Sequence, residues 1–159
     1  MADWFILNAR EAGWEVGQFG AFLSFRESDG TRFEQVGVNI AVLGPGQATG
    51  MYHAENNQEG FLVLIGECLL LVEGEQRRLK RWDYFHCPPW TEHILIGAGE
   101  HGCTLLGIGA RVTREIVYPV SELAQRHQAS VARETHDPRE AYASVTPDEE
   151  VAYRDEWLG

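Results

Sequence analysis

The sequence predicts an all-β fold that is followed by short helices. Between residues 21 and 112, short apolar segments rich in β-branched residues alternate with turn signals such as Asp29-Gly30. Many short strands at such spacing are typical of a β-sandwich or barrel. Helical patterns appear only after Pro119. The chain has 159 residues, which fits one domain, and its 44% of hydrophobic residues can supply a core.

The expected strands follow one another in chain order. Segment 21–25 leads into the turn 27–30, whose Asp-Gly pair is a strong hairpin signal. The apolar run 61–65 is expected to stop at Gly66. In full, strands are expected at 21–25, 35–43, 61–65, 69–72, 76–80, 93–97 and 104–112, with turns at 73–75 and 99–102.

Capping signals mark the part of the chain after the strands as helical. They are Ser121, Asp137-Pro138 with Glu140, and Thr146-Pro147 with Glu149. From residue 134 to 157 there are eight acids and two arginines. Three parts are therefore expected: an apolar N-terminal packing or dimer segment (1–20), the barrel (21–118), and a helical, acidic C-terminal extension (119–159).

Composition limits the partners and the location of the protein. The net charge of −11 argues against nucleic acid and against anionic membrane surfaces. No apolar run reaches membrane-spanning length, and the first ten residues lack the features of a signal peptide, so a cytoplasmic location is expected. Three scattered cysteines, Cys68, Cys87 and Cys103, fit packed, reduced thiols better than a disulfide framework.

Apolar surface predicts the assembly, and missing motifs exclude some chemistries. The apolar segment 1–18 and the strand 35–43 offer more apolar face than one small barrel should leave wet, so a homodimer is expected. The only lysine, Lys80, lies in a polar strand, so a buried Schiff-base lysine is not expected. The chain has no dinucleotide-binding glycine motif, no P-loop and no serine-nucleophile elbow.

Two stretches, 50–66 and 82–93, carry a candidate metal site. His53 and Glu55 are two residues apart, so in an extended strand their side chains share one face. Glu59 follows in the same stretch, and His93 closes the second. Two imidazoles and two carboxylates that converge from two segments would bind a divalent metal such as Zn, Mn, Fe or Ni.

These stretches resemble the two sequence motifs of the cupin family. His53, Glu59 and Gly66 match the spacing of the first motif, and Pro88 and His93 match the second. Five positions depart from the pattern. Glu55 stands for a histidine, Trp82 and Trp90 for glycines, and Gly97 for an asparagine, and Gly50 lies three residues before His53 instead of six. The resemblance implies a small single-domain cupin with an antiparallel jelly-roll barrel, like the RmlC-like proteins. Metal cupins of this kind include dioxygenases, decarboxylases and sugar-phosphate isomerases.

Several roles stay open at this stage. Glu55 is either the fourth metal ligand or a general base. His86, seven residues before His93, is favoured as an ordinary surface or core histidine over a residue near the metal. The function is either that of a metal-dependent enzyme on a small organic or sugar-like substrate, or that of a non-catalytic cupin that binds a small ligand or a metal. No catalytic residue is assigned.

Overall fold

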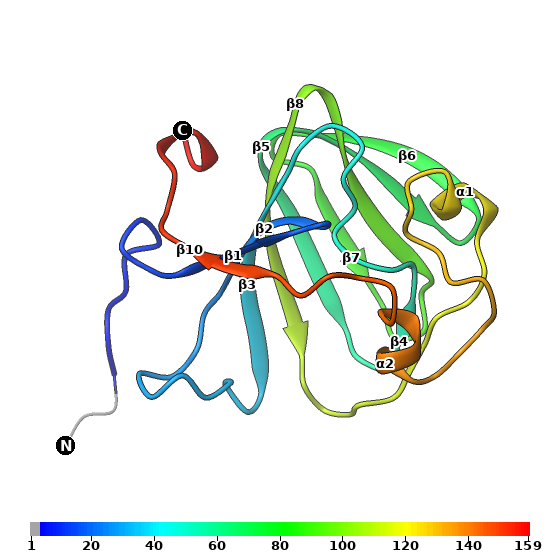
Figure 1. Ribbon diagram of the computed structural model, residues 1–159, viewed down its shortest axis with the longest axis horizontal. Helices are drawn as coiled ribbons and strands as arrows, with labels where there is room; N and C mark the ends of the chain where they lie inside the picture. Colours follow the sequence, from blue (N-terminus) through cyan, green and yellow to red (C-terminus); the bar gives the residue numbers. More distant parts are fainter. Residues whose placement is uncertain (1–3) are drawn as a thin grey trace.

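The computed structural model describes residues 4–159 and confirms the all-β jelly-roll fold with short C-terminal helices (Figure 1). One large antiparallel sheet has the strand order β10-β1-β2-β3-β8-β5-β6, with β7 paired to β5, and a two-stranded sheet joins β4 and β9. The strands are β1 (Trp14–Gly17), β2 (Gly20–Ser24), β3 (Val36–Leu43), β4 (Ala54–Glu55), β5 (Glu59–Val72), β6 (Glu75–Lys80), β7 (Tyr84–Cys87), β8 (His93–Ala110), β9 (Ile116–Val117) and β10 (Glu149–Val151). The helices are α1 (Glu122–Gln125), α2 (Pro138–Ala141) and the 3₁₀ helix η1 (Asp155–Trp157).

The two longest strands, β5 and β8, pair along most of their length. The break expected at Gly66 is wrong, because β5 continues through it. Residues 99–102 lie within β8 but have no partner in β5, because Glu67 pairs with Ala98 and the adjacent Gly66 pairs with Cys103. The turn expected at 99–102 is therefore present as four unpaired residues inside the strand. Gly66 has a φ of 73° and lies at a register shift, so it forms a bulge instead of an end. A Cβ at Gly66 would lie 2.1 Å from the carbonyl oxygen of Gly102, so glycine allows this close approach of the two backbones.

Side chains alternate between the barrel interior and its outer face. The interior cluster on β3, β5 and β8 includes Leu43, Val63 and Leu105, each at most 1% exposed. The outer face of the same strands carries Ile40 and Leu106, which pack with Trp14 and Trp157. The C-terminal segment therefore covers part of the outer face, as its position beside β1 in Figure 1 indicates.

The C-terminal extension contains less helix than the sequence predicts. Ser121 and Asp137 cap their helices as expected, since their side chains accept hydrogen bonds from backbone N–H groups. The third expected helix is wrong, because Glu149–Val151 forms strand β10 and pairs with β1. Pairing with an open sheet edge has overridden the local capping signal there. The boundaries after residues 20 and 118 stay predictions.

The helices in the described part of the chain are short. None of those between residues 4 and 159 has the length and apolar character to cross a bilayer. The cytoplasmic location stays a prediction from the sequence.

Candidate metal centre

The two candidate histidines lie directly opposite each other on neighbouring backbone segments. His53 and His93 form an antiparallel bridge, in which each backbone N–H donates to the carbonyl oxygen of the other residue. Residues paired in this way direct their side chains to the same face. Their imidazole rings therefore meet, with centroids 4.9 Å apart.

The same local contact fixes both imidazoles. His53 Nδ1 lies 2.7 Å from the carbonyl oxygen of Met51, and His93 Nδ1 lies 2.9 Å from that of Thr91. A carbonyl oxygen only accepts hydrogen bonds, so each Nδ1 carries the proton and donates it. In the neutral imidazole, Nε2 then holds a free lone pair, and this is the usual arrangement of a metal-binding histidine.

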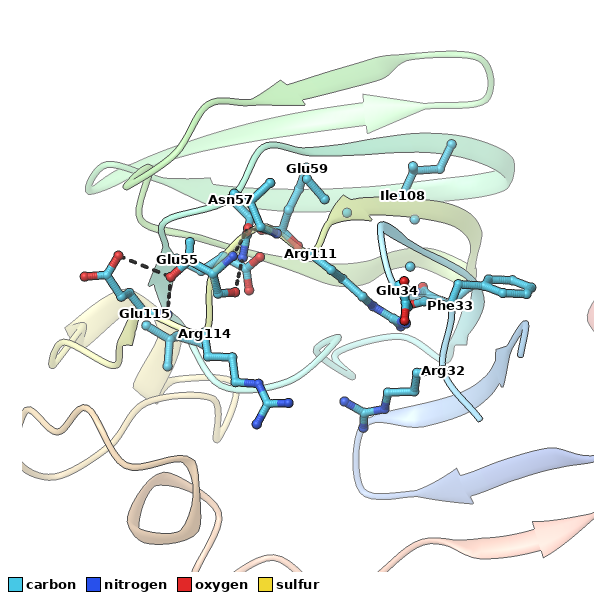
Figure 2. A pocket seen from close by; sticks show the side chains of 18 of the residues that line it. Arg32, Phe33, Glu34, Glu55, Asn57, Glu59, Ile108, Arg111, Arg114 and Glu115 are labelled. Carbon is cyan, nitrogen blue, oxygen red and sulfur yellow. Dashed lines mark hydrogen bonds between the residues drawn. The ribbon is translucent and has the colours of Figure 1, made fainter. Parts of the chain in front are cut away.

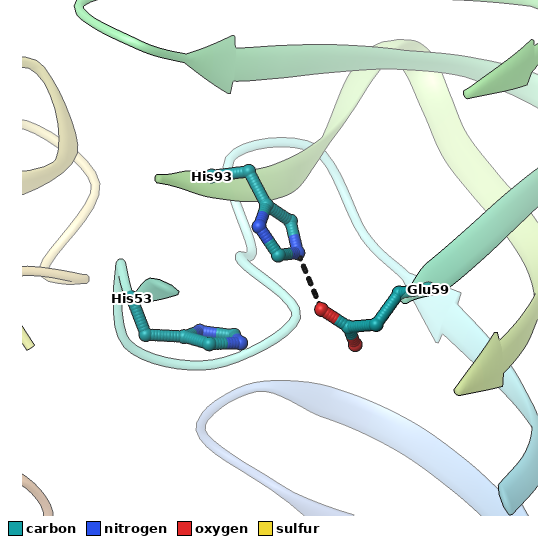
Figure 3. Close-up of side chains that lie close together, drawn as sticks. All are labelled: His53, Glu59 and His93. Carbon is teal, nitrogen blue, oxygen red and sulfur yellow. Dashed lines mark ion pairs between the residues drawn. The ribbon is translucent and has the colours of Figure 1, made fainter. Parts of the chain in front are cut away.

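Glu59 approaches the histidines from the start of β5. Its position is set by antiparallel pairing with Cys87 of β7 and Gly109 of β8. The Glu59 Oε2 atom lies 3.3 Å from His93 Nε2, with its side chain only 15% exposed (Figure 3). This buried oxygen has no hydrogen-bond partner among the described residues. A lone pair of Glu59 therefore faces a lone pair of His93.

Burial keeps the three side chains uncharged when no cation is bound. Burial, followed by the charge of Glu55, raises the pKa of Glu59 to about 8. Burial lowers the pKa of His93 to about 3, and the neighbouring His53 adds to this effect. Burial also lowers the pKa of His53. At neutral pH the contact between His93 and Glu59 is thus not an ion pair, because the imidazole is neutral and the carboxyl group is largely protonated.

Three of the four predicted ligands come together, and the residues fit a divalent cation. One ligand atom each from His53, Glu59 and His93 lies within 4.8 Å of the others. Two imidazole nitrogens and a carboxylate oxygen suit Zn, Mn, Fe or Ni. A cation between them would satisfy the unpartnered oxygen of Glu59 and both Nε2 lone pairs at once.

Glu55 lies next to this group but is not among the three converging residues. Glu55 lies on β4, two residues after His53. Its half-buried side chain lines the same cavity as Glu59. Its charge adds to the rise that burial causes in the pKa of Glu59 and opposes the fall that burial causes in the pKa of His53. Its role as a fourth ligand stays a prediction.

His86 and Cys87 take different faces of β7. His86 is exposed on the outer face, away from the converging side chains. Cys87 is buried, and its Sγ lies 3.4 Å from His93 Nδ1, on the side of the ring that is opposite the free Nε2. Burial and the charge of Glu59 raise the pKa of this thiol to about 12, so it stays protonated and is a poor ligand.

A cavity of about 860 Å³ opens beside Glu55 and Glu59 (Figure 2). Its size lies in the range of small-molecule sites. Its wall includes three arginines that the sequence analysis did not single out: Arg32, Arg111 and Arg114. Arg111 and Arg114 share the loop after β8, whereas Arg32 lies in the loop before β3, so no local motif joins the two loops. Phe61 lines the cavity too, and its ring centroid lies 5.5 Å from that of His93.

Comparison with known proteins identifies the barrel. The family model described as "Cupin domain" matches residues 39–109, which contain all four predicted ligands. No curated protein matches the chain.

Solved structures share the fold at low sequence identity. KdgF from Halomonas sp. matches with a TM-score of 0.57 and 18% identity, over 70% of this chain and 96% of the other. An RmlC-like cupin from Shewanella frigidimarina matches with a TM-score of 0.56 and 18% identity, over 70% and 93%. A provisionally named sugar phosphate isomerase from Acidithiobacillus ferrooxidans matches with a TM-score of 0.52 and 22% identity, over 62% of this chain and 64% of that one, less than two thirds of its length.

The raised pKa of Glu59 predicts how the stability of the metal-free protein changes with pH. Because the folded state binds this proton more tightly than the unfolded chain does, its contribution to stability is complete below the ordinary glutamate pKa of 4.5 and is lost as pH rises through about 8. Between these limits, the free energy of unfolding of the wild type should fall relative to that of Glu59→Gln by about 1.4 kcal/mol per pH unit. Urea denaturation in the presence of a chelator measures this difference.

The matched control is Glu100→Gln, which removes a carboxylate that is 94% exposed. The difference between the wild type and this control should not change with pH over the same interval. A constant difference between the wild type and Glu59→Gln would contradict the assignment of a buried, protonated Glu59.

Proposed function

Because the chain belongs to the cupin superfamily, we propose that it is a metal-dependent enzyme acting on a small organic or sugar-like substrate, in the dioxygenase, decarboxylase or isomerase class. The observation that carries this proposal is the buried Oε2 of Glu59, which faces His93 Nε2 at 3.3 Å without a hydrogen bond. Two lone pairs held at this distance call for a proton or a cation between them. The second imidazole, from His53, makes a cation the better match.

In this proposal His53, His93 and Glu59 hold the metal, and Glu55 either completes the set or transfers protons. A divalent cation would supply a Lewis acid and a template for substrate. Three protein ligands leave positions open for substrate, as catalytic sites require. The rings of Phe61 and Phe85, with centroids 5.5 and 5.8 Å from that of His93, exclude water from the imidazole. Exclusion of water strengthens the electrostatic interactions at the site.

Glu55 is the best-placed group for proton transfer. Its carboxylate lines the cavity and accepts no hydrogen bond from the described residues, whereas its backbone carbonyl is held by the N–H of Trp90 at 2.8 Å. The backbone is therefore fixed while the carboxylate stays available. A general base needs this combination of position and free lone pairs.

A second candidate function is a non-catalytic barrel that binds a small ligand. The pKa values favour it in one respect, because His53, His93 and Glu59 are all uncharged at neutral pH without a cation. The site is therefore stable as a neutral pocket wall. Metal binding by the purified protein separates the two candidates.

We also propose a homodimer, which the outer face of β3 and β8 supports. Val38 pairs with Ile108, and the neighbouring Val36 pairs with Ala110 on the same face. Val36 and Ile108 are 38% and 45% exposed, since the cover formed by Trp14 and Trp157 reaches only the other end of these strands. An uncovered apolar strand face of this kind is typical of an interaction site.

Metal binding should depend on both histidines. Titration of the chelator-treated wild type with Mn²⁺ is expected to give one site per chain. His93→Ala and His53→Ala should each weaken that site by more than about a hundredfold, because loss of even an outer hydrogen-bond partner costs about 10–100-fold. Calorimetry measures the affinity, and the exposed His86→Ala serves as the matched control with unchanged binding. Full Mn²⁺ occupancy in the His53→Ala, His93→Ala double variant would contradict the assigned metal site and would favour the non-catalytic binding barrel.

Substitution of Glu55 separates its two roles. A Glu55 that acts as a base is not a metal ligand. In that role, Glu55→Gln should keep the Mn²⁺ affinity within about tenfold of the wild-type value, while turnover of any substrate falls by about 10²–10⁴-fold. Glu100→Gln, which removes a carboxylate that is 94% exposed and lies outside the cavity, is the control and should change neither quantity. A loss of Mn²⁺ affinity as large as that of His93→Ala would instead make Glu55 the fourth ligand.

Charge placed on the uncovered face should break the dimer. The Val36→Glu, Ile108→Glu variant is expected to sediment as a monomer at micromolar concentration, because both side chains would bury a carboxylate in the interface. The wild type should sediment as a dimer under the same conditions. Val120→Glu adds charge at a site that is 52% exposed and should leave the dimer intact. A monomeric wild type would contradict the proposal.

A further inference from the structure

Three guanidinium groups gather at the cavity beside the candidate metal centre. Arg32 comes from the loop between β2 and β3, whereas Arg111 and Arg114 follow the end of β8. Figure 2 shows Arg32 and Arg114 extending toward each other from opposite sides of the opening. In a chain with a net charge of −11, three of the 13 basic residues thus line one cavity.

These arginines are not used for ion pairs within the chain. No described acid lies within salt-bridge distance of Arg32, Arg111 or Arg114. Four arginines elsewhere on the surface do have a carboxylate partner: Arg26, Arg77, Arg78 and Arg139. The cavity therefore keeps guanidinium donors available for a ligand.

The backbone around the arginines is held in place. Asn57, only 8% exposed, accepts hydrogen bonds from the backbone N–H groups of Val112 and Thr113 and donates one to the carbonyl oxygen of Thr113. This amide fixes the turn between Arg111 and Arg114. It also joins that turn to the segment between Glu55 and Glu59.

Arg111 in turn holds the loop that carries Arg32. Its Nη1 donates to the carbonyl oxygen of Phe33 at 2.5 Å, and its backbone N–H donates to that of Gln35 at 3.0 Å. One guanidinium N–H is used in this way, and a guanidinium has five. The structure thus fixes the loops while leaving most donors free.

Acidic groups also line the cavity, but two of the four are engaged. Glu115 accepts hydrogen bonds from Asn56 and Thr113 at 2.6 and 3.2 Å. Glu59 faces the candidate metal centre, where its Oε2 lies 3.3 Å from His93 Nε2. Glu34 and Glu55 also line the cavity. None of these four carboxylates lies within salt-bridge distance of Arg32, Arg111 or Arg114, so the guanidinium groups stay available to a ligand.

We infer that this cavity binds a small organic anion, whose carboxylate or phosphate group is held by Arg32 and Arg114, with Arg111 behind them. A planar guanidinium binds either group through two parallel hydrogen bonds. The inference rests on the proposed function, because the other end of the ligand would reach the cation held by Glu59. It adds that the substrate of that site is an anion.

Titration of chelator-treated protein with succinate and, separately, with inorganic phosphate tests the inference by calorimetry. One anion per chain should bind, and the arm with the higher affinity identifies the preferred group. The Arg32→Gln, Arg114→Gln variant should weaken binding by about tenfold or more, because each substitution removes a charge-assisted contact. Arg126→Gln removes the exposed arginine that follows α1 as its C-cap residue, and it should change the affinity less than about twofold. Succinamide, which is neutral, should not bind.

The Arg114→Lys variant keeps the charge but loses the planar fork, so it should show an intermediate affinity. Thermal unfolding checks that each variant is folded. Equal affinities in the wild type and the double variant, or the same loss in Arg126→Gln, would overturn the inference. Mn²⁺ titration of the same variants keeps the two proposals distinct: retained Mn²⁺ binding without an anion site removes only the anionic substrate, and an arginine-dependent anion site without Mn²⁺ binding removes only the metal.

Discussion

The central constraint on this structure is that three hydrogen-bond acceptors, one each from His53, Glu59 and His93, are held together in one buried site. Each imidazole donates a hydrogen bond from its Nδ1–H to the backbone carbonyl oxygen two residues earlier. Both Nε2 lone pairs therefore point into the same space as the Glu59 carboxyl group. Water does not reach the Glu59 oxygen to relieve the contact. Only a proton on Glu59 or a bound cation can do so, and the raised pKa of Glu59 is the consequence when the cation is absent.

The barrel imposes this confinement through strand pairing. The bridge between His53 and His93 sets the two rings side by side, and the pairing of Glu59 with Gly109 and Cys87 aims the carboxyl group at them. Asn57 then ties the turn with Arg111 and Arg114 to the same segment. The stretch from His53 to Glu59 thus contributes to both the metal centre and the cavity, and a change of register in β5 would affect both.

Much of this could be predicted from the sequence, and the failures have a common cause. The strand pattern is local, and the two stretches that carry His53, Glu59 and His93 resemble the cupin motifs, so the sequence indicated that these three residues converge. Gly66 and Glu149 were misread because bulges and edge pairing depend on a partner strand. Trp82 and Trp90, which replace motif glycines, keep the left-handed backbone with φ values of 76° and 65°. The arginine cavity was missed because the loop that carries Arg32 meets the loop that carries Arg111 and Arg114 only after folding.

The number of protons released when Mn²⁺ binds tests whether a protonated Glu59 lies between two neutral histidines in the metal-free protein. Calorimetric titration at pH 7 in buffers of different ionisation enthalpy gives this number. With a Glu59 pKa of about 8, the chelator-treated protein should release about 0.9 proton per Mn²⁺, because the carboxyl group must ionise to bind while the neutral imidazoles release none. Tight binding of Mn²⁺ with a proton release near zero would contradict a metal held by Glu59 between two neutral histidines.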